Sequence, residues 1–514
     1  MRGLPSGARG RRGAARNPSG RSRCTSVRRS DATIRVRADR ARSTRSAASG
    51  ASARRDGTDR TARGRAAGVW LYDLIYLLAA VVSAPVLAYL LVRRPRIRDG
   101  VWERLGRGLP RRDGPRRCVW IHGVSVGEVL GARPLVAELR RRFPELDLAV
   151  STTTGTGFAM AQRHYGEHTL LRYPIDVGFA VRRALDAIRP AVVVLVEGEI
   201  WPNFLAHCRR RSIPVVLVNG RMTERSFRGY RRLRWLLRPG LDAIRLWCAQ
   251  SGEYAERYRA LGIPAARVLE TGSLKYDALL QPEDVEQDGA RYRSVFGVGE
   301  APVLVAGSTH EGEERAVLEA YAGLCRRVPA LRLVIVPRHL ERVVQVQRYC
   351  QQARFVPVCK TAIDRGEVEP ARLGSPETVF VVDTIGELAR LYAMATVVFV
   401  GGSLVRHGGQ NVLEPAGLGK PVVVGPHTYN FRAAVALLRE ADAIVQIGGA
   451  EELEGALGEL LENEERARAV GDRARAAVEA RRGAARRTVD AIARFLPPAV
   501  VTAVGEREVT RSRP

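Results

Sequence analysis

A glutamate follows the first apolar run of the central part of the chain, and its position suits it to act on a ligand. In CVWIHGVSVGE, residues 118–128, the mostly apolar run 119–122 predicts a buried strand, and Glu128 falls where a helix pattern begins. A helix N-terminus carries roughly half a positive charge and unpaired N–H groups, so a carboxylate there is held ionised. Open α/β sheets bind ligands at the same point. The competing interpretation is that Glu128 only caps the helix.

Two further segments offer groups for phosphate and nucleoside. Arg338 and His339 follow another predicted strand, where an arginine suits bidentate phosphate binding, although the chain has 80 arginines and this one is also explained as a surface residue. Gly386 and Glu387 lie at a strand-to-helix turn whose free N–H groups can take phosphate or base acceptors. These turns therefore predict a nucleotide-binding edge in the second half of the chain.

The glycine-rich segment GGSLVRHGGQNVLEPAGLGK, residues 401–420, is the most informative of all. Its glycines allow close backbone approach, Asn411 stands at a helix start, and the carboxylate of Glu414 can accept both hydroxyls of a ribose. The glycines are also compatible with a plain loop. No Asp-x-Asp occurs in the chain, which points away from a metal-held diphosphate, and no cofactor is expected.

Strand-like runs position these groups. From about residue 116 onward, short runs rich in valine and leucine alternate with helical patterns, as expected for parallel strands covered on both faces. A polar stretch at residues 281–298 interrupts the alternation, and a second series follows. This predicts two doubly wound α/β domains with a cleft between them. No GxGxxG follows a strand with an acidic residue about 20 positions further on, which disfavours NAD.

The N-terminal part of the 514-residue chain differs in composition. Residues 1–68 carry 19 arginines against four aspartates, about half of the net charge of +29, with few apolar residues, so they cannot build a core. Such a tail can bind nucleic acid or anionic lipid, or it lies outside the working protein. Residues 74–92 carry no charge and precede an arginine cluster, which predicts a retained membrane anchor, spanning or half-inserted, rather than a cleaved signal peptide. The arginine cluster predicts that the part of the chain after the anchor lies on the cytoplasmic side. Seven scattered cysteines without a CxxC pair fit a reducing compartment.

Several segments in one order resemble a known family. The chain resembles the 3-deoxy-D-manno-oct-2-ulosonic acid (Kdo) transferases over about residues 70–495, through SVGE, EIWPN, NGRMTERSFRGY, AQSGEYAERYRALG, AGSTHEGEE, VPRH, GGSLV and NVLEPAGLGKPVVVGPHTYNF. The resemblance implies a GT-B fold of two facing Rossmann-like domains, an N-terminal membrane anchor and metal-independent inverting transfer of Kdo from CMP-Kdo to a lipid A precursor, on the cytoplasmic side of the inner membrane. No nucleic-acid partner is expected.

The resemblance also assigns residues. Glu128 matches the family's catalytic base, and Glu197 and Lys275 match positions that stabilise the transition state; the competing interpretation of Glu197 is a helix cap at a strand end. The CMP-binding segments correspond to Pro337, Arg338, Ile385, Gly386, Glu387, Asn411, Val412, Leu413 and Glu414. The chain departs from the family pattern at Gly123, Gly155 and Gly198, at Gln410 and Val412, and at Arg406 and His407.

The expected organisation follows. We expect a disordered tail (1–68), an anchor with its basic flank (69–98), an acceptor-binding domain (99–280), a linker (281–298), a nucleotide-sugar-binding domain (299–496) and a C-terminal tail (497–514). The basic residues 221–238 fit either a surface for lipid phosphates or an ordinary solvated helix. Two alternatives remain, a GT-B transferase with another sugar nucleotide and a membrane-anchored binding protein whose tail holds nucleic acid.

Overall fold

The computed structural model describes residue 93, residues 100–198 and residues 200–496. The predicted tails at 1–68 and 497–514, and the predicted anchor at 69–98 apart from Arg93, lie outside the described residues. Among the helices that the structure does describe, none has the length and apolar character needed to cross a bilayer.

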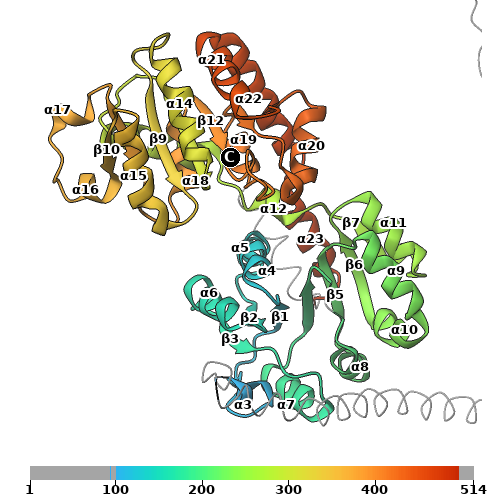
Figure 1. The fold of residues 1–514 in the computed structure, drawn as a ribbon. Helices are drawn as coiled ribbons and strands as arrows, with labels where there is room; N and C mark the ends of the chain where they lie inside the picture. The colour runs from blue at the N-terminus through green and yellow to red at the C-terminus, as the bar shows by residue number, and fades with distance from the viewer. Residues whose placement is uncertain (1–92, 94–99, 199, 497–514) are drawn as a thin grey trace, which may run out of the picture. The chain divides into compact units, whose positions relative to one another are not determined.

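The first half of the described chain forms a sheet of seven parallel strands. Its strands lie in the order β3-β2-β1-β4-β5-β6-β7, so the order reverses between β1 and β4. The strands are β1 (Cys118–His122), β2 (Asp147–Thr152), β3 (Thr169–Arg172), β4 (Val192–Val196), β5 (Val215–Gly220), β6 (Ile244–Ala249) and β7 (Val268–Glu270). Helices connect them as predicted for a doubly wound fold (Figure 1).

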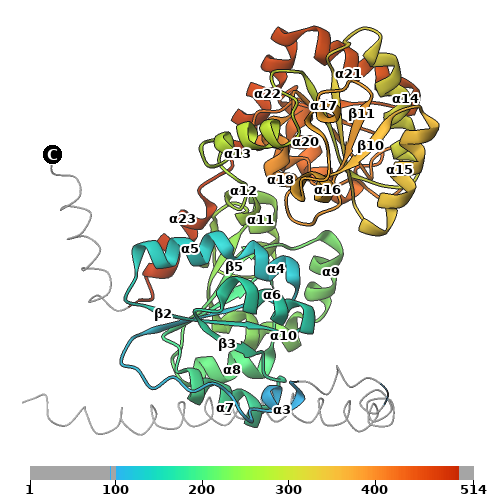
Figure 2. The same cartoon turned by 90° about the vertical axis from the view of Figure 1, so that its left-hand side faces the viewer.

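Helices cover both faces of this sheet (Figure 2). Alternate strand residues point to opposite faces: Val119 and Ile121 join one apolar cluster, and Cys118 and Trp120 join the other. The first cluster is completed by α4, α5 and α6, and the second by α7, α8, α10 and α11. The helices of this half are α3 (Val101–Arg104), α4 (Val126–Gly131), α5 (Arg133–Arg142), α6 (Gly155–Tyr165), α7 (Gly178–Ile188), α8 (Pro202–Arg210), α9 (Glu224–Arg232), α10 (Arg234–Ala243), α11 (Gly252–Ala260) and α12 (Leu274–Asp277).

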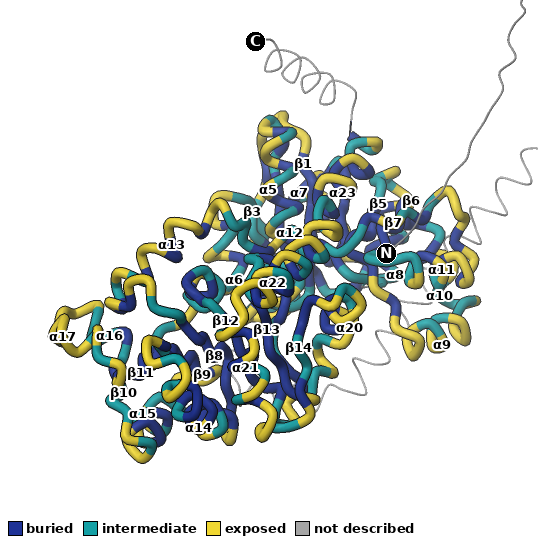
Figure 3. Tube along the Cα trace, turned by 90° about the horizontal axis from the view of Figure 1, so that it is seen from above, coloured by how far each residue is buried: buried dark blue, intermediate teal, exposed yellow. Residues whose placement is uncertain are grey.

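The second half forms another sheet of seven parallel strands, in the order β10-β11-β9-β8-β12-β13-β14. The strands are β8 (Val303–Thr309), β9 (Arg332–Pro337), β10 (Val356–Cys359), β11 (Thr378–Val381), β12 (Val397–Val400), β13 (Val422–Val424) and β14 (Val445–Gln446). The order reverses between β8 and β12. In Figure 3 the central strands of this sheet, such as β8, β9 and β12, are mostly dark blue, which marks them as buried, while outward turns of the helices are yellow.

Helices again lie on both faces of the second sheet. They are α13 (Pro282–Val295), α14 (Glu313–Cys325), α15 (Val343–Gln352), α16 (Lys360–Asp364), α17 (Pro370–Leu373), α18 (Leu388–Leu391), α19 (Leu413–Gly417), α20 (Arg432–Glu440), α21 (Leu453–Glu462) and α22 (Glu464–Glu479). The last described helix, α23 (Ala484–Ala493), packs on the first sheet instead. The prediction of an α/β architecture with parallel sheets is therefore confirmed.

Two expected boundaries differ from the structure. The stretch 281–298, expected as a linker, contains helix α13, and its Tyr292, Phe296 and Val298 belong to the core of the second sheet. The expected second domain ended at residue 496, but α23 joins the core of the first sheet through Val489 and Ile492. The stretch 281–298 is polar overall, so the apolar side of α13 was not recognised. An amphipathic helix such as α23 shows in its sequence that it has a buried side, but not which sheet that side packs on.

Candidate functional site

Glu128 lies in the first turn of α4, immediately beyond β1, and takes part in a reciprocal cap. The N-cap Ser125 accepts a hydrogen bond from the Glu128 backbone N–H, and the Ser125 hydroxyl donates to Glu128 Oε1 at 3.0 Å. The other carboxylate oxygen, Oε2, accepts from the backbone N–H of Val124 at 2.7 Å. Glu128 is therefore part of the helix cap, but its side chain has other neighbours as well.

Glu197 follows the last residue of β4 and has a left-handed backbone, with a φ of 68°. A non-glycine residue in this region costs about 1 kcal/mol or more, and such residues gather at functional sites. Asn219 in β5 shares the conformation, with a φ of 52°, and its side-chain amide donates to Glu197 Oε1 at 3.5 Å. Asn219 Oδ1 accepts from the Leu274 backbone N–H at 3.1 Å. Asn219 thus connects Glu197 to the start of α12.

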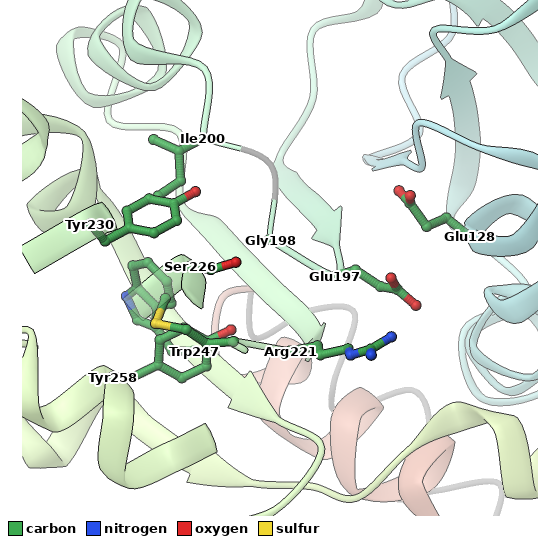
Figure 4. A pocket seen from close by; sticks show the side chains of 10 residues that line it. Glu128, Glu197, Gly198, Ile200, Arg221, Ser226, Tyr230, Trp247 and Tyr258 are labelled. Carbon is green, nitrogen blue, oxygen red and sulfur yellow. The ribbon is translucent and has the colours of Figure 1, made fainter. Parts of the chain in front are cut away.

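A cavity of about 240 Å³ lies at the carboxyl end of the first sheet and brings Glu128 and Glu197 into one site. Because β1 and β4 are the strands at which the sheet order reverses, this is the switch point at which α/β folds bind ligands. In Figure 4 the Glu197 and Arg221 side chains extend in the same direction, toward the side of the cavity on which Glu128 lies. Arg221 follows β5 directly, and its backbone N–H donates to the Glu197 carbonyl at 3.1 Å.

The remaining wall of the cavity is mostly apolar and aromatic. Its larger side chains are Ile200, Met222, Tyr230, Trp247 and Tyr258, and Gly198 and Ser226 complete it. Trp247 Nε1 and Tyr258 Oη are buried and have no hydrogen-bond partner among the described residues. Aromatic faces with a few polar groups are typical of sites that bind sugars and other organic ligands.

Lys275 is the predicted catalytic residue that does not line this cavity. It lies in the first turn of α12, where its backbone N–H is capped by the Ser273 hydroxyl, and it is exposed. Its role in the transition state stays a prediction. The structure does relate Lys275 to the site, because the neighbouring Leu274 is held by Asn219, which also contacts Glu197.

The predicted CMP-binding residues lie at the carboxyl end of the second sheet. Pro337 ends β9, and the exposed Arg338 follows it. Glu414, in the first turn of α19, accepts from the Asn411 amide at 2.9 Å, while Val412 and Leu413 between them are buried in the core. Burial raises the pKa of Glu414, and the hydrogen bond from Asn411 and the positive charge of Arg338 act in the opposite direction.

The second predicted segment, Ile385–Glu387, lies beyond β11. Ile385 is 83% exposed, which is unusual for a large apolar side chain, and Gly386 has open space where a Cβ would stand. The Glu387 carboxylate accepts from the Tyr292 hydroxyl at 3.1 Å and pairs with Lys360 at 3.3 Å. Ile385 and Gly386 are thus accessible to a ligand, while Glu387 is engaged by its own fold.

The sequence did not single out three polar residues that the structure places at strand ends, namely Arg221, Asn219 and His310. Each lies within one residue of the carboxyl end of a strand, at β5 or β8, so position relative to the strands was the available signal. Among the described residues, no group of three histidine, cysteine or carboxylate side chains is arranged to hold a metal ion. The described cysteines form no disulfide, and Cys118, Cys208, Cys248 and Cys350 are buried.

Comparison with known proteins agrees with this architecture. The sequence profile of a family described as 3-deoxy-D-manno-octulosonic-acid transferase (kdotransferase) matches residues 99–278. The 3-deoxy-D-manno-octulosonic acid transferase of Bordetella pertussis is 36% identical over 444 residues, covering 82% of this chain and 99% of that protein. The enzyme of the same name from Haemophilus influenzae is 31% identical over 431 residues, with 83% and 98% covered.

Among solved structures, the UDP-GlcNAc 2-epimerase of Neisseria meningitidis covers 74% of this chain and 100% of its own, with 14% identity and a TM-score of 0.50, which shows a shared fold. The C-terminal CMP-Kdo binding domain of WaaA from Acinetobacter baumannii is 28% identical over 38% of this chain and 99% of its own, with a TM-score of 0.35. The long matches to the two transferases, at more than 30% identity, confirm the family predicted from the sequence motifs. The chain belongs to the 3-deoxy-D-manno-octulosonic acid transferase family of glycosyltransferases.

Proposed function

We propose that this protein is an inverting, metal-independent glycosyltransferase that moves Kdo from CMP-Kdo to a lipid A precursor in lipopolysaccharide biosynthesis. Family membership supports the transferase activity and the CMP-Kdo donor. The observation that carries the catalytic assignment is the cavity at the first switch point, which holds Glu128 and Glu197 together.

In the proposed reaction, Glu128 is the general base. Its carboxylate takes the proton of an acceptor hydroxyl while that oxygen forms a bond to the anomeric carbon of Kdo. The bond between this carbon and the phosphate oxygen breaks, its electron pair leaves with CMP, and attack from the opposite face inverts the configuration. The start of α4 and the backbone N–H of Val124 favour the ionised carboxylate before the proton arrives.

Arg221 and Lys275 are the cations that we place near the charge that develops on the leaving phosphate. Arg221 lines the cavity beside Glu197, and Lys275 reaches the site only if α12 adjusts or the donor extends to it. Glu197 is a positioning residue in this proposal, because its strained backbone and its contact with Asn219 fix the wall opposite Glu128. The donor nucleotide lies at the second sheet's edge, with Arg338 on phosphate and Glu414 on ribose.

We also propose that the protein works at the cytoplasmic face of the inner membrane, because its acceptor is a lipid. The connection between α9 and α10 supports this placement: Leu233 and Trp235 are 49% and 75% exposed and stand among the exposed Arg231, Arg232 and Arg238. Exposed tryptophan beside arginine is typical of surfaces that meet lipid headgroups. Helix α9 also supplies Ser226 and Tyr230 to the cavity, so this surface adjoins the catalytic residues.

The deciding experiment is a transfer assay with radiolabelled CMP-Kdo and a lipid A precursor in detergent micelles that contain EDTA. We expect labelled product from the full chain, and no product when CMP-Kdo is replaced by CMP-sialic acid or a UDP-sugar. A folded protein that binds CMP but transfers Kdo to no lipid A precursor would contradict the proposal and favour a different donor or acceptor.

A further inference from the structure

The second sheet has its own switch point, between β8 and β12, and His310 lies there. His310 follows Thr309, the last residue of β8, while the loop after β12 runs from Gly401 to Gln410. A Cβ at Gly401 would lie 2.5 Å from the Ser308 carbonyl, so only glycine lets the two strand ends approach this closely. Ligands of α/β folds bind at such a place.

His310 is held in one orientation by aromatic and polar neighbours. Only 7% of the residue is exposed. Its ring stacks on that of His407, with centroids 4.3 Å apart and planes 18° from parallel, and the ring of His339 meets it edge-on at 5.8 Å. The amide nitrogen of Gln410 lies 3.1 Å from His310 Nε2.

With its amide nitrogen toward His310 Nε2, Gln410 matches one of the two neutral tautomers of the ring. An amide nitrogen can only donate, so Nε2 accepts and the proton is on Nδ1. The Cδ2–Nε2 edge faces Gly402 and Gln410, which leaves Nδ1 on the opposite edge of the ring. Nδ1 has no hydrogen-bond partner among the described residues and is not one of the buried unpaired atoms, so it reaches solvent as a free donor.

The charges around this donor are mostly positive. Burial, followed by the charges of His407, His339, Arg338 and Arg342, lowers the pKa of His310 to about 4. The ring is therefore neutral at physiological pH, which agrees with the Gln410 contact. Within the part of the chain that the structure describes, no carboxylate lies within ion-pair distance of Arg338, His339 or His407.

The carboxylates nearest in sequence are occupied elsewhere. Glu313 is fully buried and accepts four backbone N–H groups, those of His310, Gly402, Ser403 and Leu404. Glu314 and Glu311 both pair with Arg342. Arg338 thus forms no ion pair among the described residues, and its positive charge close to His310 favours an anionic ligand.

We propose that His310, as a neutral imidazole, donates a hydrogen bond from Nδ1 to an oxyanion of the sugar nucleotide, the phosphate or the sugar carboxylate, with Gln410 fixing the tautomer and His407 the ring plane. This assignment rests on the proposed function and adds a donor-binding residue to it. A neutral donor binds the oxyanion without itself being titrated, so the affinity for donor does not change with the protonation of His310 above about pH 5.

Two substitutions of His310 separate the hydrogen bond from packing. His310→Asn places an amide N–H near the position of Nδ1, whereas His310→Leu fills a similar volume without any donor. Because the hydrogen bond goes to a charged acceptor, we expect H310L to weaken sugar-nucleotide binding about 10- to 100-fold. The affinity of H310N should stay within about threefold of wild type.

The binding probes are CMP and cytidine, measured by calorimetry with the full chain, and CMP-Kdo, measured by its KM in the transfer assay. If the phosphate is the partner, H310L lowers the affinity for CMP and not that for cytidine. If the sugar carboxylate is the partner, CMP affinity is unchanged and only the KM for CMP-Kdo rises. Either pattern supports the assignment, and unchanged CMP affinity together with an unchanged KM overturns it.

The tautomer is tested by Gln410→Glu, which keeps the shape of the side chain. A carboxylate beside Nε2 accepts a proton from it, so in Q410E the neutral ring presents a bare Nδ1 to the ligand and only the protonated ring still donates. We expect the KM for CMP-Kdo to rise more steeply between about pH 6 and 8 in Q410E than in wild type, because ionisations common to both proteins cancel in the comparison. A Q410E profile parallel to that of wild type overturns the assignment even if H310L fails to fold.

These outcomes are distinct from failure of the proposed function. Kdo transfer by wild type with a donor KM unaffected by H310L overturns only the role of His310. Absence of both Kdo transfer and CMP binding in the folded wild-type chain overturns the function and, with it, this assignment.

Discussion

The substitution Glu128→Gln separates the two interpretations of this glutamate. A glutamine retains one oxygen that can accept from the Val124 N–H, and its amide can donate to the Ser125 hydroxyl, so both cap contacts survive in altered form. What is lost is the charge at the start of α4, worth about 0.3–1 kcal/mol of stability, and the capacity to take up a proton.

The effects on rate and on stability therefore differ in size. Removal of a general base lowers the rate about 10²- to 10⁴-fold, which corresponds to about 3–5 kcal/mol in the activation free energy. We expect the kcat of Glu128→Gln to fall by at least 100-fold in the radiolabel assay at saturating CMP-Kdo. The unfolding free energy, from urea titration followed by circular dichroism, should fall by about 1 kcal/mol or less.

The matched control is Ser125→Ala. This variant removes the N-cap of α4, at a cost of about 1 kcal/mol, but leaves the Glu128 carboxylate in place with its Val124 contact. We expect its kcat to stay within about tenfold of wild type. The reasoning is refuted if folded Glu128→Gln protein keeps more than a tenth of the wild-type kcat, because Glu128 is then only a cap.

Three further outcomes are expected. Asn219→Ala should lower both kcat and the unfolding free energy, the latter by about 2–4 kcal/mol. The substitution removes two hydrogen bonds, including that to Glu197, and puts alanine at a φ of 52°. An unchanged denaturation midpoint would contradict this. Glu313→Gln should cost about 3–5 kcal/mol in a urea titration, since an amide N–H₂ then faces backbone N–H groups in a fully buried position. Burial lowers the pKa of Lys420 to about 8, so Lys420→Met should stabilise the protein at pH 7 by about 1–3 kcal/mol. This gain should shrink as the pH rises from about 8 toward 10.5. Over that range the lysine of the folded wild type is already neutral while that of the unfolded chain loses its proton, so wild-type stability recovers.

The strands and the position of Glu128 were predictable because local sequence determines them. Parallel strands covered on both faces need continuous apolar runs, and β1, β4 and β12 are such runs. Ser125 and Glu128 have the spacing of a capping box, which marks the helix start without reference to the rest of the chain.

What could not be predicted depends on residues distant in the chain. Helix α23 returns to the first sheet, where the Asp277 carboxylate accepts the Gly483 and Ala485 N–H groups, more than 200 positions along the chain. The contacting rings of His310, His339 and His407 likewise come from the segments after three different strands. The sequence marks the segments of His339 and His407 individually, but only the strand order brings these residues together.

A comparison of the two switch points also supports the proposal that the first sheet holds the catalytic base. Each has a glutamate in the first turn of the helix that follows its first strand, Glu128 in α4 and Glu313 in α14. A carboxylate has about four acceptor positions, and Glu313 uses four on backbone N–H groups while fully buried, so it can neither reach a ligand nor take up a proton without breaking the loop after β12. Glu128 is only half-buried and lines the cavity. The same position thus organises the loop after β12 in one half, and under the proposed mechanism it offers a base in the other.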